Sequence, residues 1–231
     1  MEQKVLIILG SPGSGKGTQA NLLSEKFGLY HFRSSGIVGR IIEKAEPGSF
    51  IEVEGKKYYF EEQKQLRESG KLWDPPFLTY FVEEKTKQLH KEEEGIVFDG
   101  ALRTMYECER VIPILKQLYG IDNIKVIYLE ITEDEAIFRN THRRECELAR
   151  HPVLYSDETV KLTKCQLDGS KLVERKDDSP EVIKVRLKEF QDRTIPLLKL
   201  FEKQGLMVDK IDGSPSPADV FKNILKVLGE K

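Results

Sequence analysis

The stretch VLIILGSPGSGKGT, residues 5–18, decides the fold. It begins as a short apolar run typical of a buried strand, and it continues as a glycine-rich loop. A helical pattern follows over Gln19–Phe27. Glycines allow backbone N–H groups to converge on phosphate oxygens, and the helix N-terminus adds the positive end of its dipole. The order of strand, glycine loop and helix therefore predicts a phosphate-binding loop.

Two side chains of this loop are expected to bind the nucleotide and its magnesium ion. Lys16 can reach the β- and γ-phosphates of a nucleoside triphosphate, and Thr18 offers a hydroxyl group to a magnesium ion. The strict pattern places Ser or Thr directly after the lysine, whereas Gly17 intervenes here, so the loop is a variant. The alternative is a glycine-rich turn that binds nothing. We expect the triphosphate to contact Gly13, Ser14, Gly15, Lys16, Gly17 and Thr18.

Further apolar runs outline the rest of the fold. Short runs without strict alternation suit strands that are buried on both faces of a parallel sheet. Helical segments alternate with these runs, which predicts an α/β fold: a doubly wound, five-stranded parallel sheet of the P-loop type, with helices on both faces. The predicted strands are Val5–Leu9, Tyr30–Phe32, Ile96–Phe98, Ile124–Ile131 and Leu206–Ile211.

Capping signals mark several helix ends. Thr132 with Glu135 forms a capping box ahead of a predicted helix over Ala136–Arg144. Ser179-Pro180 and Ser216-Pro217 each place a good cap before a proline at the first helical position.

Two stretches interrupt the alternation of strands and helices. Residues 34–73 are mostly polar and helical, and residues 142–178 mix Cys, His, Pro, Asp and Gly without a helical period. Both are typical of insertions at a sheet edge, where mobile lids lie. We therefore expect one domain over residues 1–231, with a core of 1–33, 74–141 and 179–231 and two mobile inserted subdomains.

The amino-acid composition argues against several classes of binding partner. The formal net charge is −2 and no long block of Lys or Arg occurs, which argues against nucleic acid or an anionic membrane. No apolar run approaches the ~20 residues that a membrane helix needs. The N-terminus lacks the apolar core of a signal peptide, and three cysteines do not suggest a disulfide framework. We expect a cytoplasmic monomer.

A second candidate metal-binding side chain follows a buried strand. Asp99 comes directly after the apolar run Ile96–Phe98, where it is well placed to hold magnesium through water. The alternative is an aspartate that caps a turn before Gly100.

Several motifs together resemble the adenylate kinase family of nucleoside monophosphate kinases, in particular its long-lid bacterial members. The loop Gly10–Thr18 has the family's form, including Gly17. Further matches occur in order along nearly the whole chain: Ser34-Ser35-Gly36 with Arg40, Asp99-Gly100-Ala101-Leu102-Arg103-Thr104, Arg139 with Arg143-Arg144, and Arg175-Lys176-Asp177-Asp178 followed by Arg186.

The chemistry explains why such a chain carries these arginines. Phosphoryl transfer between two nucleotides gathers many negative charges, so catalysis consists of positioning and electrostatic stabilisation. Arginine supplies bidentate cations better than lysine does. Arg139 and Arg143 are four residues apart on a predicted helix, so we expect them to share one face.

The resemblance implies a role for each residue. The catalytic set that contacts the transferring phosphates would be Lys16, Arg143, Arg175 and Arg186, together with Arg103, and Arg139 would stack on the base of ATP. On the monophosphate side the resemblance implies Ser35, Gly36, Arg40, Arg103, Glu107, Arg175 and Arg186. Asp177 and Asp178 would position arginines of the lid.

The acceptor base is the open question. The family's adenine-reading glutamine falls on Glu107, and a carboxylate only accepts hydrogen bonds, which would suit guanine. The alternative is that Glu107 is an exposed helix residue and that the base is read elsewhere. Ile37 stands where the family usually has aspartate, Ala101-Leu102 replace Phe-Pro, and residues 46–59 are additional.

The lid also raises a metal question. The zinc-bearing lids of bacterial relatives have four ligands, and Cys146, Cys165 and Asp168 match the first, third and fourth. Ala149 stands at the second position and cannot bind a metal, but His151 could replace it. The alternative is a lid closed by polar and apolar contacts with two unused thiols.

The resulting hypothesis is an adenylate kinase that moves the γ-phosphoryl group of Mg·ATP to AMP and gives two ADP. The nearest alternative is the same chemistry on GMP, CMP or UMP. A P-loop switch without kinase activity is another, although the chain has no Asn-Lys-x-Asp motif for guanine. A third is a catalytically silent binding module with a zinc lid.

Overall fold

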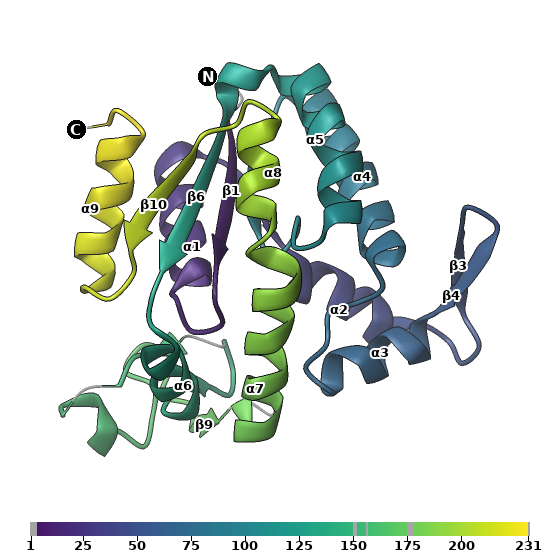
Figure 1. Ribbon diagram of the computed structural model, residues 1–231. Helices are drawn as coiled ribbons and strands as arrows, with labels where there is room; N and C mark the ends of the chain where they lie inside the picture. Colours follow the sequence, from purple (N-terminus) through teal and green to yellow (C-terminus); the bar gives the residue numbers. More distant parts are fainter. Residues whose placement is uncertain (1–3, 150–151, 156, 175–177, 231) are drawn as a thin grey trace.

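A five-stranded parallel sheet forms the centre of the protein (Figure 1). The computed structural model describes residues 4–149, 152–155, 157–174 and 178–230. The strands lie in the order β10-β6-β1-β5-β2, which confirms the predicted doubly wound α/β sheet. Their bounds are β1 Val5–Gly10, β2 Tyr30–Arg33, β5 Ile96–Asp99, β6 Ile124–Glu130 and β10 Val208–Asp212.

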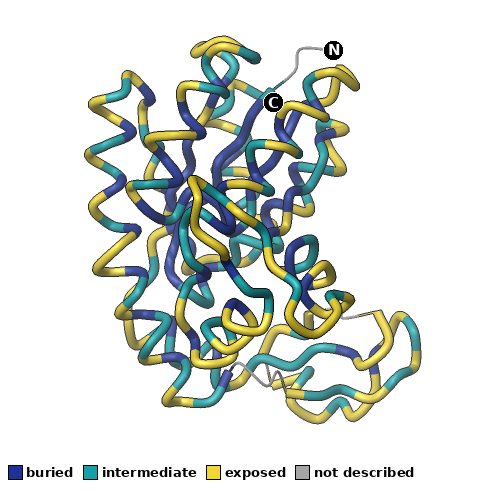
Figure 2. Tube along the Cα trace, turned by 90° about the vertical axis from the view of Figure 1, so that its right-hand side faces the viewer, coloured by how far each residue is buried: buried dark blue, intermediate teal, exposed yellow. Residues whose placement is uncertain are grey.

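Helices cover both faces of this sheet. Every residue of β1 is buried, and alternate side chains enter two different cores. Val5, Ile7 and Leu9 pack against α4, α5 and α8, whereas Leu6 and Ile8 pack against α1 and α9. The tube in Figure 2 shows the buried strands between exposed helical surfaces. These helices are α1 Lys16–Phe27, α4 Pro75–Lys91, α5 Met105–Tyr119, α8 Leu197–Lys203 and α9 Pro217–Val227.

The predicted helix caps are present, but one predicted helix end is wrong. Thr132 Oγ1 accepts a hydrogen bond from the N–H of Glu135, and this cap starts α6, Glu133–Thr141. The helix stops before Arg143, whereas the sequence predicted it to run to Arg144. The chain instead enters strand β7, Arg144–Cys146, where pairing with β9 fixes an extended backbone. Tertiary pairing has overridden local helical preference.

The first inserted stretch is only partly helical. Residues 34–73 contain α2, Ser34–Lys44, and α3, Phe60–Glu68, as expected for a helical arm. The additional residues form an antiparallel hairpin of β3, Phe50–Val53, and β4, Lys56–Tyr59. The hairpin projects beside α4 (Figure 1), and its turn residue Glu54 forms an ion pair with Arg110 of α5.

The second inserted stretch forms a small sheet of its own. Strands β8, Pro152–Val153, β7 and β9, Leu172–Glu174, are antiparallel in the order β8-β7-β9. Short 3₁₀ turns lie at Thr159–Lys161 (η2) in this stretch and at Ile121–Asn123 (η1) before β6.

A long helical run connects this small sheet with the core. It consists of α7, Pro180–Glu189, a π-helical turn η4, Phe190–Thr194, and α8. Figure 1 shows α7 and α8 as one nearly continuous column. Among the residues that the structure describes, no helix combines the length and the apolar character that crossing a membrane would need.

The buried ring of Phe98 provides a test of this core. Phe98 is fully buried, and its ring lies 5.5 Å from that of Phe32, centroid to centroid. We expect Phe98→Ala to lower the free energy of unfolding by about 3–5 kcal/mol, because the cavity left behind cannot fully collapse. Urea denaturation measures this. The matched control, Phe138→Ala, removes a ring that is 47% exposed and should cost about 1.5 kcal/mol or less, since the loss is mainly its ring contacts with His142 and Tyr155.

Candidate active site

The glycine loop between β1 and α1 has the backbone of an anion site. Gly13 and Gly15 have φ values of 86° and 88°, in the left-handed region where glycine meets no steric cost. At Gly13 a Cβ atom would also lie 2.6 Å from the side-chain nitrogen of Asn140. Gly15 caps α1 without a side chain, so the first N–H groups of the helix receive no side-chain acceptor. These N–H groups can bind phosphate oxygens.

Lys16 folds back over this loop. Its Nζ atom donates to the carbonyl oxygens of Gly10 and Ser11, both at 2.7 Å. Burial lowers the pKa of Lys16 to about 7, although the two carbonyl acceptors favour the ammonium form. The positive charge of Arg103 is the next largest cause, Asp99 opposes it, and Arg186 and Arg143 lower the pKa further. Each of the three arginines therefore lies within electrostatic reach of Lys16.

Asp99 ends β5 directly beside the first turn of α1. A Cβ atom at Gly17 would lie 3.3 Å from its Oδ2 atom, so the intervening glycine leaves room for this carboxylate. Burial alone would raise the pKa of Asp99, but the hydrogen bond with His31 and the charge of Lys16 outweigh it and lower the pKa. Asp99 is therefore ionised at neutral pH. Thr18 lies in the same first turn of α1.

The sequence analysis missed two side chains that contact Asp99. His31 Nε2 lies 3.4 Å from Asp99 Oδ2, and Arg33 Nε lies 3.6 Å from the same atom. Both come from β2, which pairs with β5 so that Arg33 stands opposite Asp99. In the sequence, His31 and Arg33 alternate with the apolar Phe32, which places both polar side chains on one face of the strand. That they meet Asp99 follows only from the pairing of β2 with β5, which the sequence alone does not give.

Asp178 brings two of the predicted catalytic arginines together. Arg143 forms a bidentate pair with it, at 2.9 Å from Nε to Oδ2 and 2.6 Å from Nη2 to Oδ1. Arg186 Nη1 lies 3.1 Å from the same Oδ1 atom. The Asp178 side chain is only 4% exposed, so this pairing is strong and well oriented. Arg175 and Asp177, assigned to the same group, lie outside the described residues.

Arg139 lies on the other side of the loop. Its guanidinium group donates to the carbonyl oxygens of Gly213 and Ser214, both at 2.9 Å, and approaches that of Gly13 at 3.5 Å. It also forms an ion pair with Glu135. Because α6 ends at Thr141, Arg139 and Arg143 do not share a helical face, contrary to the expectation from their spacing.

The loop after β5 carries the next predicted arginine. The Oγ atom of Ser34 donates to the carbonyl of Gly100 at 2.8 Å, and Thr194 Oγ1 donates to the carbonyl of Arg103 at 3.1 Å. The Arg103 guanidinium lies over Gly100, where a Cβ atom would be only 2.4 Å from its Nη2. Burial lowers the pKa of Arg103, and the charges of Asp99 and Glu107 partly offset this effect.

The remaining residues predicted for the monophosphate lie on or beside this side of the sheet. Arg40 is exposed on α2, and Ser35 and Gly36 belong to the first turn of that helix. Glu107 is 2% exposed in the first turn of α5, so the alternative that it is an exposed helix residue is wrong. Burial raises its pKa.

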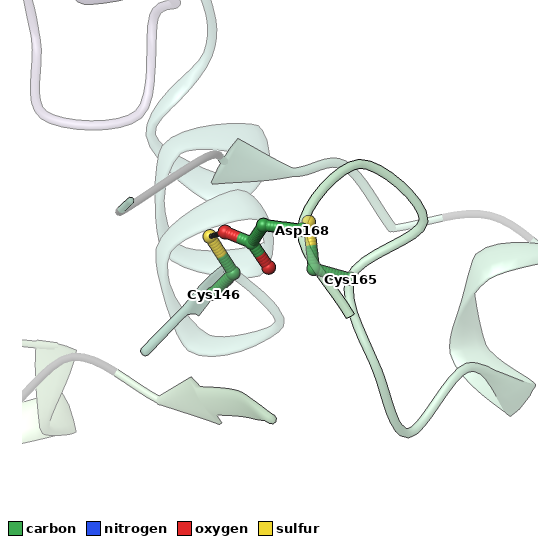
Figure 3. Close-up of side chains that lie close together, drawn as sticks. All are labelled: Cys146, Cys165 and Asp168. Atoms are coloured by element: carbon green, nitrogen blue, oxygen red, sulfur yellow. Dashed lines mark hydrogen bonds between the residues drawn. The ribbon is translucent and has the colours of Figure 1, made fainter. Parts of the chain in front are cut away.

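Three potential metal ligands meet in the small sheet (Figure 3). Cys146 lies on β7, and Cys165 and Asp168 lie in the turn before β9; their ligand atoms are all within 4.8 Å of one another. Cys146 Sγ lies 2.9 Å from Asp168 Oδ2, and the N–H of Leu167 points at Cys165 Sγ at 3.4 Å. His151, the fourth predicted ligand, is outside the described residues.

Comparison with known proteins decides the family. The sequence profile of the family described as adenylate kinase matches residues 8–206. The chain belongs to the adenylate kinase family. The adenylate kinase of Caldicellulosiruptor saccharolyticus is 32% identical over 226 residues, which cover 97% of this chain and 98% of that relative. The adenylate kinase of Archaeoglobus fulgidus is 31% identical, over 96% of this chain and 97% of its own.

Family membership confirms the resemblance derived from the motifs. The chain is an enzyme, a nucleoside monophosphate kinase of the phosphotransferase class. Within the part of the chain that the structure describes, the glycine loop, Lys16, Asp99 and three of the predicted arginines are brought together, as this chemistry requires.

The lowered pKa of Lys16 gives nucleotide binding a pH signature. In the protein without nucleotide, Lys16 becomes increasingly neutral as the pH rises above about 7. Phosphate anions in contact with Lys16 would stabilise its ammonium form and raise its pKa again. We expect ATP binding near pH 8.5 to take up protons, because the γ-phosphate itself, with a second pKa of about 6, is already fully ionised there. Titration calorimetry in two buffers of different ionisation enthalpy measures this uptake.

The uptake should vanish in Lys16→Met and persist in Lys26→Met, which removes an exposed lysine from the last turn of the same helix. Equal uptake in both variants would contradict the assignment to Lys16.

Proposed function

We propose that this kinase transfers the γ-phosphoryl group of Mg·ATP to AMP and forms two ADP. The observation that carries the proposal is the convergence of Lys16 with Arg103, Arg143 and Arg186 at the glycine loop. Two nucleotides that meet at their phosphates gather more negative charge than one triphosphate, and cations from several elements can stabilise that charge. The relatives named above as adenylate kinases support AMP as the acceptor.

The residues divide the work as follows. The N–H groups of the loop bind the phosphates of ATP, and Lys16 exchanges its contacts with Gly10 and Ser11 for phosphate oxygens. An oxygen of the AMP phosphate attacks the γ-phosphorus while the bond from the γ-phosphorus to the oxygen bridging it to ADP breaks. The charge that develops on the equatorial oxygens is stabilised by Lys16 and by the arginines, with Arg103 on the acceptor side. This reaction needs no general base from the protein.

The residues at the end of β5 fit a magnesium ion. Mg²⁺ prefers oxygen ligands and keeps several waters, and Asp99 is an ionised carboxylate beside the first turn of α1, which carries Thr18. We propose that the hydroxyl of Thr18 binds the ion directly and that Asp99 holds it through water. The ion would neutralise phosphate charge during transfer.

The inserted stretches act in this proposal as closing elements. Residues 34–73 form the monophosphate-binding arm and residues 142–178 form the lid. Their closure excludes water, because an open site would lose the phosphoryl group to hydrolysis. The monomeric state and the cytoplasmic location stay predictions.

A coupled assay for diphosphate formation tests the proposal. ATP is combined with AMP, GMP, CMP or UMP, and AMP should be the preferred acceptor. Lys16→Met should lower kcat by roughly 10²–10³-fold, as expected when one donor to the transition-state charge is removed. Lys26→Met is the control and should retain full activity.

Preference for GMP, CMP or UMP would replace AMP by that acceptor. No transfer to any of the four monophosphates would contradict kinase activity and would favour a nucleotide-binding switch.

We further propose a structural zinc ion in the lid. Cys146, Cys165 and Asp168 offer two sulfur atoms and a carboxylate at mutual distances that suit one ion, and these are ligand types that zinc binds. His151 would complete the four ligands. The ion would supply no reaction step and would hold β7 to the turn before β9.

Metal analysis tests the lid site. Protein purified without chelator should contain stoichiometric zinc, and Cys146→Ser should lose the metal and melt at a lower temperature, because metal binding contributes directly to folding. Cys108→Ser is the control, since Cys108 lies in the core helix α5, and this variant should keep its metal. Metal-free wild-type protein would contradict the site.

A further inference from the structure

Glu107 is a buried carboxylate that the proposed mechanism does not use. Its Oε1 atom accepts a hydrogen bond from the hydroxyl of Thr104 at 2.9 Å, and its Oε2 atom accepts the backbone N–H of Arg103 at 3.3 Å. In return, Thr104 Oγ1 accepts the N–H of Glu107 at 3.3 Å and caps α5. Both carboxylate oxygens therefore bind donors of the loop that precedes the helix.

This loop needs such support because its backbone is strained. Leu102 has a φ of 54°, which side chains other than glycine rarely adopt, and its side chain is fully buried. A residue in such a conformation persists only where its surroundings hold it. Cys108 Sγ approaches the Leu102 carbonyl at 3.7 Å, and Glu107 holds the N–H that follows it. Two side chains of α5, Cys108 and Glu107, thus hold the backbone on the C-terminal side of Leu102.

The same carboxylate also balances charge. Arg103 is half-buried, and among the described residues Asp99 and Glu107 are negative groups that act on its guanidinium. Asp99 in addition lies between Lys16 and His31, so its charge is shared. Glu107 therefore contributes to Arg103 both a backbone contact and a counter-charge.

We infer that Glu107 is a positioning residue, which fixes the loop before α5 and with it the direction in which Arg103 faces the acceptor phosphate. This inference rests on the proposed role of Arg103. It also separates Glu107 from recognition of the base, because Glu107 is 2% exposed and both of its oxygens face donors of the loop, the hydroxyl of Thr104 and the N–H of Arg103.

The isosteric variant Glu107→Gln tests the inference. An amide has one accepting oxygen, so one of the two donors loses its partner and the counter-charge disappears. We expect kcat/KM for AMP to fall roughly tenfold or more, as for the loss of a buried charged acceptor, while KM for ATP stays unchanged. The ratio of activities with AMP and GMP should also stay unchanged. Kinetics are measured well below the melting temperature of each variant.

A second measurement does not depend on activity. Amide hydrogen exchange followed by NMR should show that the N–H of Arg103 exchanges faster in Glu107→Gln than in the wild type. Glu109→Gln is the matched control, because Glu109 is an exposed carboxylate two residues further along the same helix. It should change neither exchange nor kinetics.

Each other outcome overturns a specific statement. A large shift in the ratio of AMP to GMP activity would make Glu107 a reader of the base. A lower melting temperature with unchanged kinetics and unchanged Arg103 exchange would reduce it to a stabilising residue. Wild-type protein without transfer to any monophosphate would contradict the proposed function, and the exchange of the Arg103 amide would still decide whether Glu107 holds this loop.

Discussion

Repulsion between cations is the constraint on which the rest of the site depends. Burial is the largest cause of the lowered pKa of Lys16, and Arg103, Arg186 and Arg143 lie close enough to lower it further. Like charges in a partly buried site destabilise one another more than they would in water, because the surrounding medium screens them less. A folded chain can hold such a group only if carboxylates are placed among the cations. In the described part of the chain these are Asp99, Asp178 and Glu107.

The three carboxylates offset this repulsion, and each belongs to a different part of the chain. Asp99 ends a central strand, Asp178 precedes α7 and Glu107 belongs to the first turn of α5. Each is buried or nearly so, and each also makes hydrogen bonds that fix its direction. The positively charged side chains at the loop favour the approach of phosphate groups. The same arrangement makes Lys16 sensitive to whether phosphate is present.

The sequence was informative where local rules and the fold agree. The strand, glycine loop and helix of residues 5–27 follow from apolar runs and backbone freedom, and the sheet follows from their repetition. Elsewhere, contacts between segments far apart in the sequence determine the local structure, and the local rules do not predict it. Helix α6 ends at Thr141 because the next residues form β7, which pairs with β9. Residues 50–59 form a hairpin that contacts α5 through the ion pair of Glu54 with Arg110. Glu107 lies inside the protein because Thr104 and Arg103 supply its donors, a contact between helix cap and loop that side-chain polarity alone does not predict.

The π-helical turn between α7 and α8 has a mechanical consequence. Asp178, directly before α7, binds Arg143 and Arg186, while Thr194 at the end of the turn donates to the carbonyl of Arg103. A π turn inserts one extra residue into a helix and so rotates everything beyond it. One helical column is thus connected at one end to Arg143 and Arg186, through Asp178, and further along to Arg103, through Thr194. Because both contacts belong to one helical column, a rigid-body shift of α7 and η4 would displace Asp178 and Thr194 together.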